Sequence, residues 1–475
     1  MLFKRYFDDK LAQASYLVAC EHSRLGLIVD PNRDISHYIA AAAQERVRIV
    51  AVTETHIHAD FVSGARELAA QTGATLYLSD MGGPEWQYGF LDDRNIERLT
   101  DGSRFTIGDV QVEAVLTPGH TPEHMTFLLT DTSVATEPMG ALTGDFIFVG
   151  DVGRPDLLER AAGITGTMET GARQLYQSIQ SFKLHPDYLQ IWPGHGAGSA
   201  CGKALGAMPQ STLGYEKLFN WALAESDEQR FVDQVLEGQP EPPAYFAIMK
   251  KMNRDGPGAR PKSIPREASA DEIANALDTG ADVVDMRSTA DFASMHLKRT
   301  INIPQNKSFL NWAGALLPYD RPLWFIGDAT EAGRQALADD LSLIGLERIA
   351  GVLPATAIST VRGGGAPLES TEQIRIADAK NDGAAAIIDV RSRAEFAEGH
   401  IPGATNIPLA ELQRRLTQVA PGPLVVHCQG GSRAAMAASI LKRSGRNEVK
   451  SLAGGFTEWE RSGNRVERGR PPDGS

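Results

Sequence analysis

The feature that most constrains the fold of this chain is an internal repeat in its second half. Residues 281–292 read ADVVDMRSTADF, and residues 385–396 read AAIIDVRSRAEF. Asn302-Ile303-Pro304 recurs as Asn406-Ile407-Pro408. Both matches have the same offset of 104 residues, since 389 − 285 = 104 and 408 − 304 = 104. An ungapped match over this length indicates a duplicated domain. The fold therefore has to contain two copies of one unit.

Stretches rich in Pro and Gly divide the rest of the chain. Its length of 475 residues predicts roughly three domains at about 150 residues each. Residues 255–262 (DGPGARPK) precede the first copy of the repeat, and residues 362–367 (RGGGAP) separate the two copies. Such stretches are typical of linkers. We therefore expect domains at residues 1–255, 265–365 and 370–475.

Charge and composition exclude several classes of partner. The net charge is −13, and a hydrophobic content of 42% is ordinary for a soluble globular protein. Nucleic acids and anionic membranes attract clusters of Lys and Arg, which this sequence does not offer. Without an apolar run long enough for a signal peptide or a membrane span, we expect a cytoplasmic protein. The three cysteines, Cys20, Cys201 and Cys428, are too few and too scattered for a disulfide framework.

The first region carries metal-binding side chains on four loops that follow apolar strands. Residues 55–61 (THIHADF) follow the β-rich run 47–53, and later loops contain His120, Asp145 and His195 beside Gly or Pro. A single His on a turn is more often a structural residue than a ligand. Four such loops together predict a metal site. The spacing alone leaves open whether His58 is also a ligand.

The order of these loops resembles the metallo-β-lactamase fold superfamily over roughly residues 15–200. That superfamily takes its ligands from a T-H-x-H-x-D-H loop, then from G-H-T, G-D and late G-H loops. The resemblance implies an α/β fold, an αββα sandwich. In dinuclear members the His after the loop Asp helps to hold a second metal, but this chain has Phe61 there. Because a phenyl ring has no lone pair to donate, we expect a single metal ion.

A narrower resemblance points to the persulfide dioxygenase branch of the superfamily. It rests on residues 55–60 (THIHAD), 143–145 (TGD) and especially 149–156 (VGDVGRPD). Two His and one carboxylate form the facial triad of non-haem Fe(II) oxygenases, which leaves positions open for substrate and dioxygen. The resemblance implies one Fe(II) per chain, with His56, His120 and Asp145 as its ligands. It leaves His58, Asp60 and His195 as pocket residues near the iron.

Two further residues of the first region are candidates for binding substrate. The Arg154 guanidinium offers a bidentate fork for a carboxylate of the substrate, but an ion pair with Asp151 or Asp156 is an equally good expectation. Cys201 follows His195 by six residues. Either this thiol lies near the metal and handles persulfide, or it is a loop cysteine without a role.

The second copy of the repeat contains a candidate nucleophile. An apolar strand at 424–427 leads into Cys428, and a helix-forming run at 434–442 follows. This arrangement would place the backbone N–H groups of the loop around its centre, and Arg433 would add a positive charge. Both favour the thiolate of Cys428, the nucleophilic form. The residues of the expected sulfur-binding loop are Gln429, Gly430, Gly431 and Ser432.

The motifs around this loop resemble rhodanese sulfurtransferases, α/β domains with parallel sheets. The matching residues are 389–391 (DVR), 399–404 (GHIPGA) and 454–459 (GGFTEW), and the six-residue loop implies sulfur as the cargo. Alignment of Pro322-Leu323 with Pro423-Leu424 places Gly327 opposite Cys428 and Ala332 opposite Arg433. We therefore expect the first copy to be a rhodanese-like domain without sulfur-transfer activity.

The whole arrangement resembles bacterial persulfide dioxygenase–rhodanese fusion proteins of the CstB type. The resemblance implies that a low-molecular-weight thiol persulfide and dioxygen react to give sulfite, to which Cys428 transfers a sulfane sulfur, forming thiosulfate. We expect these small molecules as partners, and a homo-oligomer. The alternative is a metal-dependent thioester hydrolase resembling glyoxalase II, with the rhodanese domain as a sulfur carrier.

Overall fold

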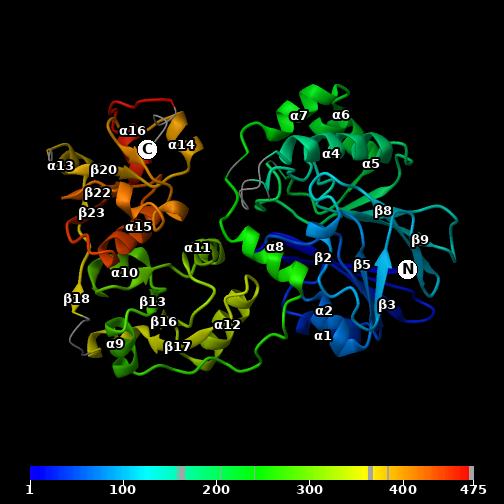
Figure 1. The fold of residues 1–475 in the computed structure, drawn as a ribbon, viewed down its shortest axis with the longest axis horizontal. Helices are drawn as coiled ribbons and strands as arrows, with labels where there is room; N and C mark the ends of the chain where they lie inside the picture. Colours follow the sequence, from blue (N-terminus) through cyan, green and yellow to red (C-terminus); the bar gives the residue numbers. More distant parts are fainter. Residues whose placement is uncertain are drawn as a thin grey trace. The chain divides into compact units, whose positions relative to one another are not determined.

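The chain forms two compact units in the computed structural model (Figure 1). The structure describes residues 1–475 except 158, 160–165, 204, 240, 362–366, 382–384 and 470–475. The first unit comprises Met1–Pro261 with Ser342–Gly345, and the second comprises Lys262–Leu341 with Leu346–Ser475. Residues 362–366, most of the expected linker between the two copies, lie outside the described residues. The limits of the three expected domains therefore stay predictions.

The first unit begins with a six-stranded sheet in the order β1-β2-β3-β4-β5-β6. The first three strands are antiparallel, and β3 to β6 are parallel. Every residue of β2 is buried, because Leu17 faces helices on one side and Tyr16 faces a second sheet on the other. The strands are β1 (Leu2–Asp8), β2 (Gln13–Ala19), β3 (Leu25–Val29), β4 (Arg48–Thr53), β5 (Thr75–Ser79) and β6 (Ile96–Leu99).

A second six-stranded sheet has the order β12-β11-β10-β9-β8-β7. Its strands pair antiparallel except for β10 and β11, which are parallel. The strands are β7 (Arg104–Ile107), β8 (Val110–Leu116), β9 (Met125–Asp131), β10 (Gly140–Gly144), β11 (Gln190–Pro193) and β12 (Ser211–Thr212).

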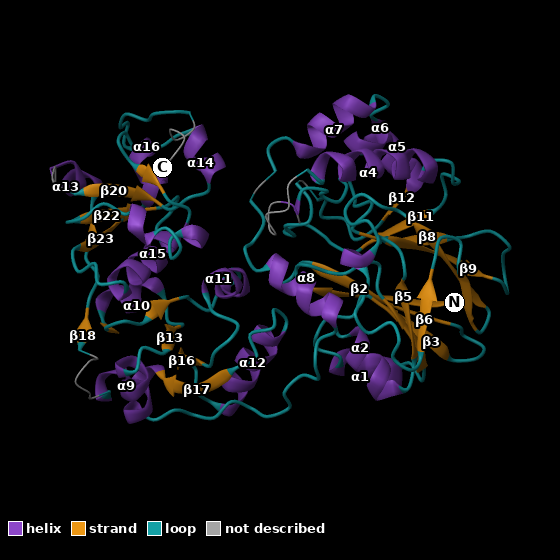
Figure 2. Cartoon of the chain, in the orientation of Figure 1, coloured by secondary structure: helices purple, strands orange, loops and turns teal. Residues whose placement is uncertain are grey.

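Helices cover the outer face of each sheet (Figure 2). Leu68 of α2 packs on the first sheet, and Leu175 of α4 packs on the second. The two sheets share a core that contains Val18 and Phe127. These four layers confirm the expected αββα sandwich. The helices of this unit are α1 (Ser36–Gln44), α2 (Ala65–Thr72), η1 (Pro84–Trp86), α4 (Met168–Phe182), α5 (Leu213–Phe219), α6 (Trp221–Ala224), α7 (Glu228–Leu236) and α8 (Phe246–Asp255).

The second unit contains two parallel sheets built to one plan. The first copy of the repeat has the order β15-β13-β16-β17, and the second has the corresponding order β21-β20-β22-β23 with β19 added at the edge. This agreement confirms the duplication and the expected α/β class. The strands are β13 (Asp282–Asp285), β14 (His296–Leu297), β15 (Ile301–Asn302), β16 (Leu323–Gly327), β17 (Ile349–Pro354), β18 (Leu368–Glu369), β19 (Gln373–Ile374), β20 (Ala386–Asp389), β21 (Thr405–Asn406), β22 (Leu424–His427) and β23 (Val449–Leu452).

Helices connect the strands of both copies, as parallel pairing requires. The first copy contains α9 (Ala270–Asp278), α10 (Thr289–Ser294), α11 (Phe309–Leu316), α12 (Glu331–Ser342) and η2 (Ala355–Thr360). The second contains α13 (Ile376–Asn381), α14 (Arg393–Glu398), η3 (Leu409–Glu411), η4 (Leu416–Gln418), α15 (Ser432–Arg443) and α16 (Gly455–Arg461). None of the described helices is both long and apolar enough to cross a membrane.

Candidate functional sites

The three expected iron ligands come together at one end of the sandwich. His56 lies just beyond β4, His120 lies between β8 and β9, and Asp145 follows β10 directly. All three are buried, and their ligand atoms lie within 4.8 Å of one another. Strands fixed in two packed sheets thus supply ligands from three separate loops.

A carboxylate oxygen of Asp145 marks the centre of this cluster. Its Oδ2 lies 3.5 Å from His120 Nε2 and 4.0 Å from His56 Nε2. This oxygen is buried and accepts no hydrogen bond from the described residues. A buried carboxylate oxygen without a donor is costly. A cation between these three side chains would remove that cost, so the residues fit a metal ion.

Hydrogen bonds at the far ring nitrogens orient both imidazoles toward Asp145. His120 Nδ1 donates to the backbone carbonyl of Arg154 at 3.0 Å. His56 Nδ1 lies 3.0 Å from Thr55 Oγ1, and that hydroxyl donates to Asp30 Oδ2. Such contacts hold the proton on Nδ1 and leave the lone pair of Nε2 for a metal. Two imidazoles and one carboxylate suit either Fe(II) or Zn(II).

Burial keeps these two imidazoles neutral. Burial lowers the pKa of His56 well below its usual range, and the neighbouring imidazole of His58 lowers it further. Burial also lowers the pKa of His120, although the Asp145 carboxylate opposes this. Neutral imidazole is the form that binds metals.

His58, whose role the spacing left open, is paired with a different carboxylate. Its Nε2 lies 3.0 Å from Asp30 Oδ1. Burial would lower the pKa of His58, but the Asp30 carboxylate raises it to about 9. The Phe61 ring is fully buried, with its centroid 4.4 Å from that of His58. His58 is therefore engaged by Asp30 and lies outside the group of His56, His120 and Asp145.

Asp60, His195 and Cys201 form a second buried group beside the first. One ligand atom from each lies within 4.8 Å of the others. His195 Nε2 is 3.2 Å from Asp60 Oδ2 and 3.5 Å from Asp145 Oδ1. Burial opposes protonation of His195, but the carboxylates of Asp145 and Asp60 raise its pKa well above the usual value. Burial raises the pKa of the Cys201 thiol to about 12.

Arg154 makes the ion pair that the sequence offered as an alternative to substrate binding. Its Nε and Nη2 donate to the two carboxylate oxygens of Asp156 at 3.1 and 2.9 Å. The side chain is fully buried, and Nη1 donates to the backbone carbonyl of Ala200. The guanidinium thus binds Asp156 and the loop that carries Cys201, whereas the backbone carbonyl of Arg154 holds His120. The expected contact with substrate stays a prediction.

Sequence reasoning missed two residues that support the ligands. Asp30 accepts hydrogen bonds from both the backbone and the hydroxyl of Thr55. His124 Nε2 accepts from the backbone N–H of Asp145 at 3.1 Å. Asp30 directly follows the apolar strand β3, the same position after a strand that indicated the ligands. That signal was available in the sequence.

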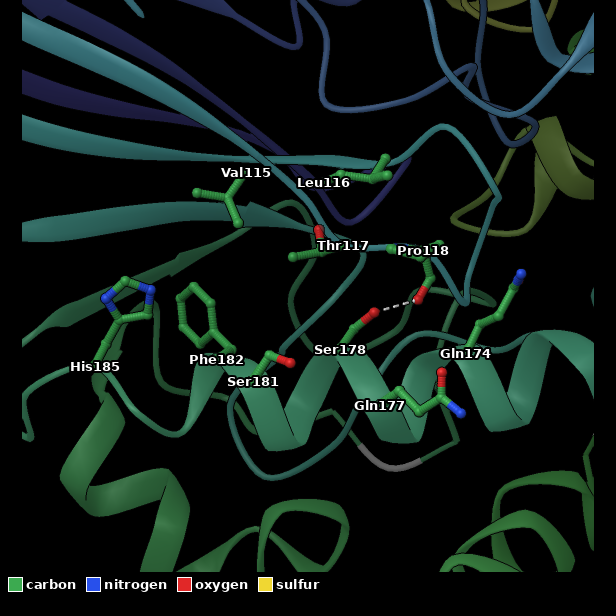
Figure 3. Close-up of a pocket in the computed structure, with 10 residues that line it drawn as sticks. All are labelled: Val115, Leu116, Thr117, Pro118, Gln174, Gln177, Ser178, Ser181, Phe182 and His185. Atoms are coloured by element: carbon green, nitrogen blue, oxygen red, sulfur yellow. Dashed lines mark hydrogen bonds between the residues drawn. The ribbon is translucent and has the colours of Figure 1, made fainter. Parts of the chain in front are cut away.

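A cavity of about 360 Å³ lies elsewhere in the first unit (Figure 3). The end of β8 and helix α4 line it, and Ser178 donates to the backbone carbonyl of Pro118 across one side. His185 and Phe182 close one end. Its lining residues are distinct from both groups of ligands, so we assign it no part in the metal site.

The Cys428 loop has the predicted form, between strand β22 and helix α15. Cys428 is 1% exposed, and its Sγ accepts the backbone N–H of Gly431 at 3.0 Å. The two terminal nitrogens of Arg433 donate to Glu395, each at 2.7 Å. Burial opposes ionisation of Glu395, but the Arg433 pair lowers its pKa to about 2. The positive charge expected from Arg433 is therefore paired with the Glu395 carboxylate, and the catalytic role of Arg433 stays a prediction.

Two family models match this chain. The model described as the metallo-β-lactamase superfamily matches residues 8–196, and the rhodanese-like domain model matches residues 373–462. A crystal structure titled as a metallo-β-lactamase from Staphylococcus aureus subsp. aureus COL is 41% identical, with a TM-score of 0.67. That match covers 74% of this chain and 98% of the other.

Curated relatives of the first region differ in their described activities. A probable polyketide biosynthesis zinc-dependent hydrolase, BaeB of Bacillus velezensis, is 26% identical over 202 residues, which are 42% of this chain and 80% of that protein. The mitochondrial persulfide dioxygenase ETHE1 of Bos taurus is 28% identical over 197 residues, 41% of this chain and 68% of the relative. The comparisons thus include both a hydrolase and a dioxygenase.

Proposed function

Because this chain belongs to the metallo-β-lactamase superfamily and carries a rhodanese-like domain, we propose that it is an Fe(II)-dependent persulfide dioxygenase coupled to sulfur transfer. The observation that carries this proposal is the buried group of His56, His120 and Asp145. Asp145 Oδ2 accepts no hydrogen bond from the described residues, and a bound cation would compensate its charge. The relative described as a persulfide dioxygenase supports it.

In the proposed first reaction, a thiol persulfide, dioxygen and water give sulfite, the free thiol and two protons. Iron held by His56, His120 and Asp145 would supply the activation of dioxygen, since a three-ligand set leaves coordination positions open. Thr55 and the carbonyl of Arg154 keep the two imidazoles in place. The fully buried Phe61 ring occupies the sequence position at which dinuclear members of the superfamily have a histidine ligand, and it offers no donor atom.

In the proposed second reaction, the Cys428 thiolate attacks the outer sulfur of another persulfide. The original S–S bond breaks, the thiol leaves, and the outer sulfur remains on Cys428. Sulfite then attacks this outer sulfur, the new S–S bond breaks, and thiosulfate departs as the Cys428 thiolate is regained. The N–H of Gly431 lies within hydrogen-bond distance of Sγ and stabilises its negative charge.

A metal-dependent hydrolase is the second candidate, favoured by the relative described as zinc-dependent. Zinc at the same three residues would generate a nucleophilic hydroxide for thioester cleavage. This function predicts turnover of a thioester without dioxygen. The dioxygenase predicts no turnover of persulfide when dioxygen is removed.

Metal content and oxygen uptake by the full chain separate the two candidates. With glutathione persulfide as substrate, we expect one iron per chain and uptake of dioxygen with release of sulfite. Asp145→Asn should remove the bound iron and the uptake together, whereas His185→Asn at the separate cavity should change neither. A protein that contains only zinc and consumes no dioxygen would contradict the proposed function.

A further inference from the structure

A separate set of metal-binding side chains lies at the opposite end of the sandwich from the expected iron ligands. Cys20 follows β2, and His22 lies in the turn between β2 and β3. Asp109 lies in the turn between β7 and β8, whereas His120 follows the far end of β8. The seven residues of β8 span about 23 Å, at about 3.3 Å per residue. The two sets are therefore too far apart to share an ion.

The side chains of Cys20, His22 and Asp109 converge on one carboxylate oxygen. One ligand atom from each lies within 4.8 Å of the others. His22 Nδ1 is 2.7 Å from Asp109 Oδ2, and the Cys20 thiol donates to the same oxygen at 3.5 Å. A thiol and an imidazole thus share a single acceptor. A divalent cation can take the place of their protons, because metals bind deprotonated thiol and neutral imidazole.

Backbone donors favour the thiolate of Cys20. Its Sγ accepts the N–H of Ser23 and the N–H of Asp109, each at 3.4 Å. Burial raises the pKa of this thiol, but these N–H groups lower it to below its usual value. The thiolate is the form of cysteine that binds metals. Cys20 thus packs in the core that the two sheets share, while its sulfur meets polar groups.

The turn that carries Asp109 is fitted closely to the Cys20 thiol. Gly108 has φ +60°, and a Cβ added there would lie 2.7 Å from Cys20 Sγ and 2.3 Å from Ser23 Oγ. Only glycine therefore lets the two turns approach this closely. The backbone carbonyl of Asp109 accepts hydrogen bonds from the N–H and the hydroxyl of Thr132, each at 2.8 Å. The backbone that carries the carboxylate is thus held against the thiol.

We propose that Cys20, His22 and Asp109 form a binding site for a thiophilic divalent metal such as Zn²⁺, separate from the proposed iron site. Zinc accepts one thiolate, one imidazole and one carboxylate as ligands. The thiolate and the carboxylate carry two negative charges, which a divalent cation balances. The side chains of His22 and Asp109 are 77% and 43% exposed, so an ion reaches them from solvent. The bound ion would join a turn of the first sheet to a turn of the second.

Cobalt binding to the full chain tests this site, because a cobalt–thiolate bond absorbs in the near ultraviolet. The chain carries Cys201→Ser and Cys428→Ser, so Cys20 is the only cysteine that remains of three. In oxygen-free buffer we expect a saturable sulfur-to-cobalt band that disappears when Zn²⁺ is added. Cobalt at the proposed iron site would give no such band, because its ligands include no sulfur. Further substitution of Cys20→Ser should remove the band, and its absence from the Cys20-containing chain would overturn the proposal.

His22→Asn in the same background gives an independent test that retains the thiol. Loss of groups that support a metal ligand typically weakens affinity about 10–100-fold, so loss of this ligand should weaken Co²⁺ binding at the thiolate by at least about 10-fold. His37→Asn is the matched control, because its Nδ1 likewise lies near a carboxylate, 3.8 Å from Asp34 Oδ2. It should leave the band unchanged. Unchanged affinity in the His22→Asn chain would contradict the site even if the Cys20→Ser chain failed to fold.

Discussion

The two copies of the repeat share one framework and differ at one loop. In each copy an Asp at the end of a strand binds an Arg two residues later, and the same Arg donates to a backbone carbonyl: Gly399 for Arg391, Met295 for Arg287. Each copy also stacks a Phe on a His at an interplanar angle of 9°. The difference teaches that the framework persists in a copy whose loop has no cysteine.

The loop after the central strand carries that difference. In the second copy the loop begins with Cys428, and Arg391 Nη1 donates to Gln429 at its rim. In the first copy Gly327 ends strand β16, and Asp328 caps the following turn by accepting the N–H of Thr330 at 3.0 Å. The thiol, which accepts the N–H of Gly431, is thus replaced by a turn that carries the Asp328 carboxylate, and this carboxylate would repel an anion.

The largest effect should come from removal of the thiol in the second copy. We expect Cys428→Ser to lower thiosulfate formation by at least about 1000-fold, because the hydroxyl is a poor nucleophile for sulfur. Oxygen uptake with glutathione persulfide should be unchanged, and sulfite should accumulate. Thiosulfate and sulfite are measured in the same reaction. If thiosulfate formation survives, the contrast between the two loops does not determine sulfur transfer.

The next effect concerns the framework that both copies share. Asp389→Asn and Asp285→Asn each leave a partly or fully buried arginine without its carboxylate, which typically costs about 3–5 kcal/mol. The cost should be larger for Asp389, because Arg391 is 2% exposed and Arg287 is 14% exposed at the side chain. Urea unfolding followed by circular dichroism measures both.

Glu460→Gln, at an exposed position, is the control for that comparison and should change stability by less than about 0.5 kcal/mol. A cost for Asp389→Asn with none for Asp285→Asn would show that the first copy does not depend on the shared ion pair. The shared Asp–Arg pair would then stabilise only the second copy.

Acid should weaken the Glu395–Arg433 ion pair of the second copy, which the first copy cannot form because position 332 is Ala. The pKa of Glu395 is lowered from 4.5 to about 2, despite burial, by Arg433. A lowered pKa means that the stabilisation is complete above about pH 4.5 and is lost as the pH falls toward about 2. Glu395→Gln should therefore flatten the loss of stability over that range. Asp291→Asn in the first copy, where position 332 is Ala, should have a smaller effect.

Much of this arrangement could be predicted from the sequence, because it depends on local patterns. The repeat fixed two similar sheets, and the loops after strands placed His56, His120 and Asp145 correctly relative to one another. Their positions after strands predicted that these side chains lie together, since the ends of neighbouring strands meet at one edge of a sheet, but the choice of these three over His58 came from the family resemblance.

The remaining features depend on contacts between residues far apart in the chain. Nothing near Arg433 in the sequence shows that Glu395, 38 residues earlier, neutralises it. Likewise, nothing near Cys201 in the sequence shows that its thiol approaches the Asp60 carboxylate. Spacing in the sequence identifies polar side chains on one loop, but only the tertiary fold shows which loops bring their side chains together.

The smallest predicted effect compares the caps of two short helices. Ser392 Oγ accepts the N–H of Glu395 at 3.2 Å at the start of α14, and Ser288 Oγ accepts the N–H of Asp291 at 3.1 Å at the start of α10. Replacing each serine with Ala should cost about 1 kcal/mol in urea unfolding. Equal losses in the free energy of unfolding would mean that the helix cap stabilises both copies to the same extent, whether or not the loop carries a cysteine. A cost confined to Ser392→Ala would mean instead that the cap serves the Glu395–Arg433 pair beside the Cys428 loop.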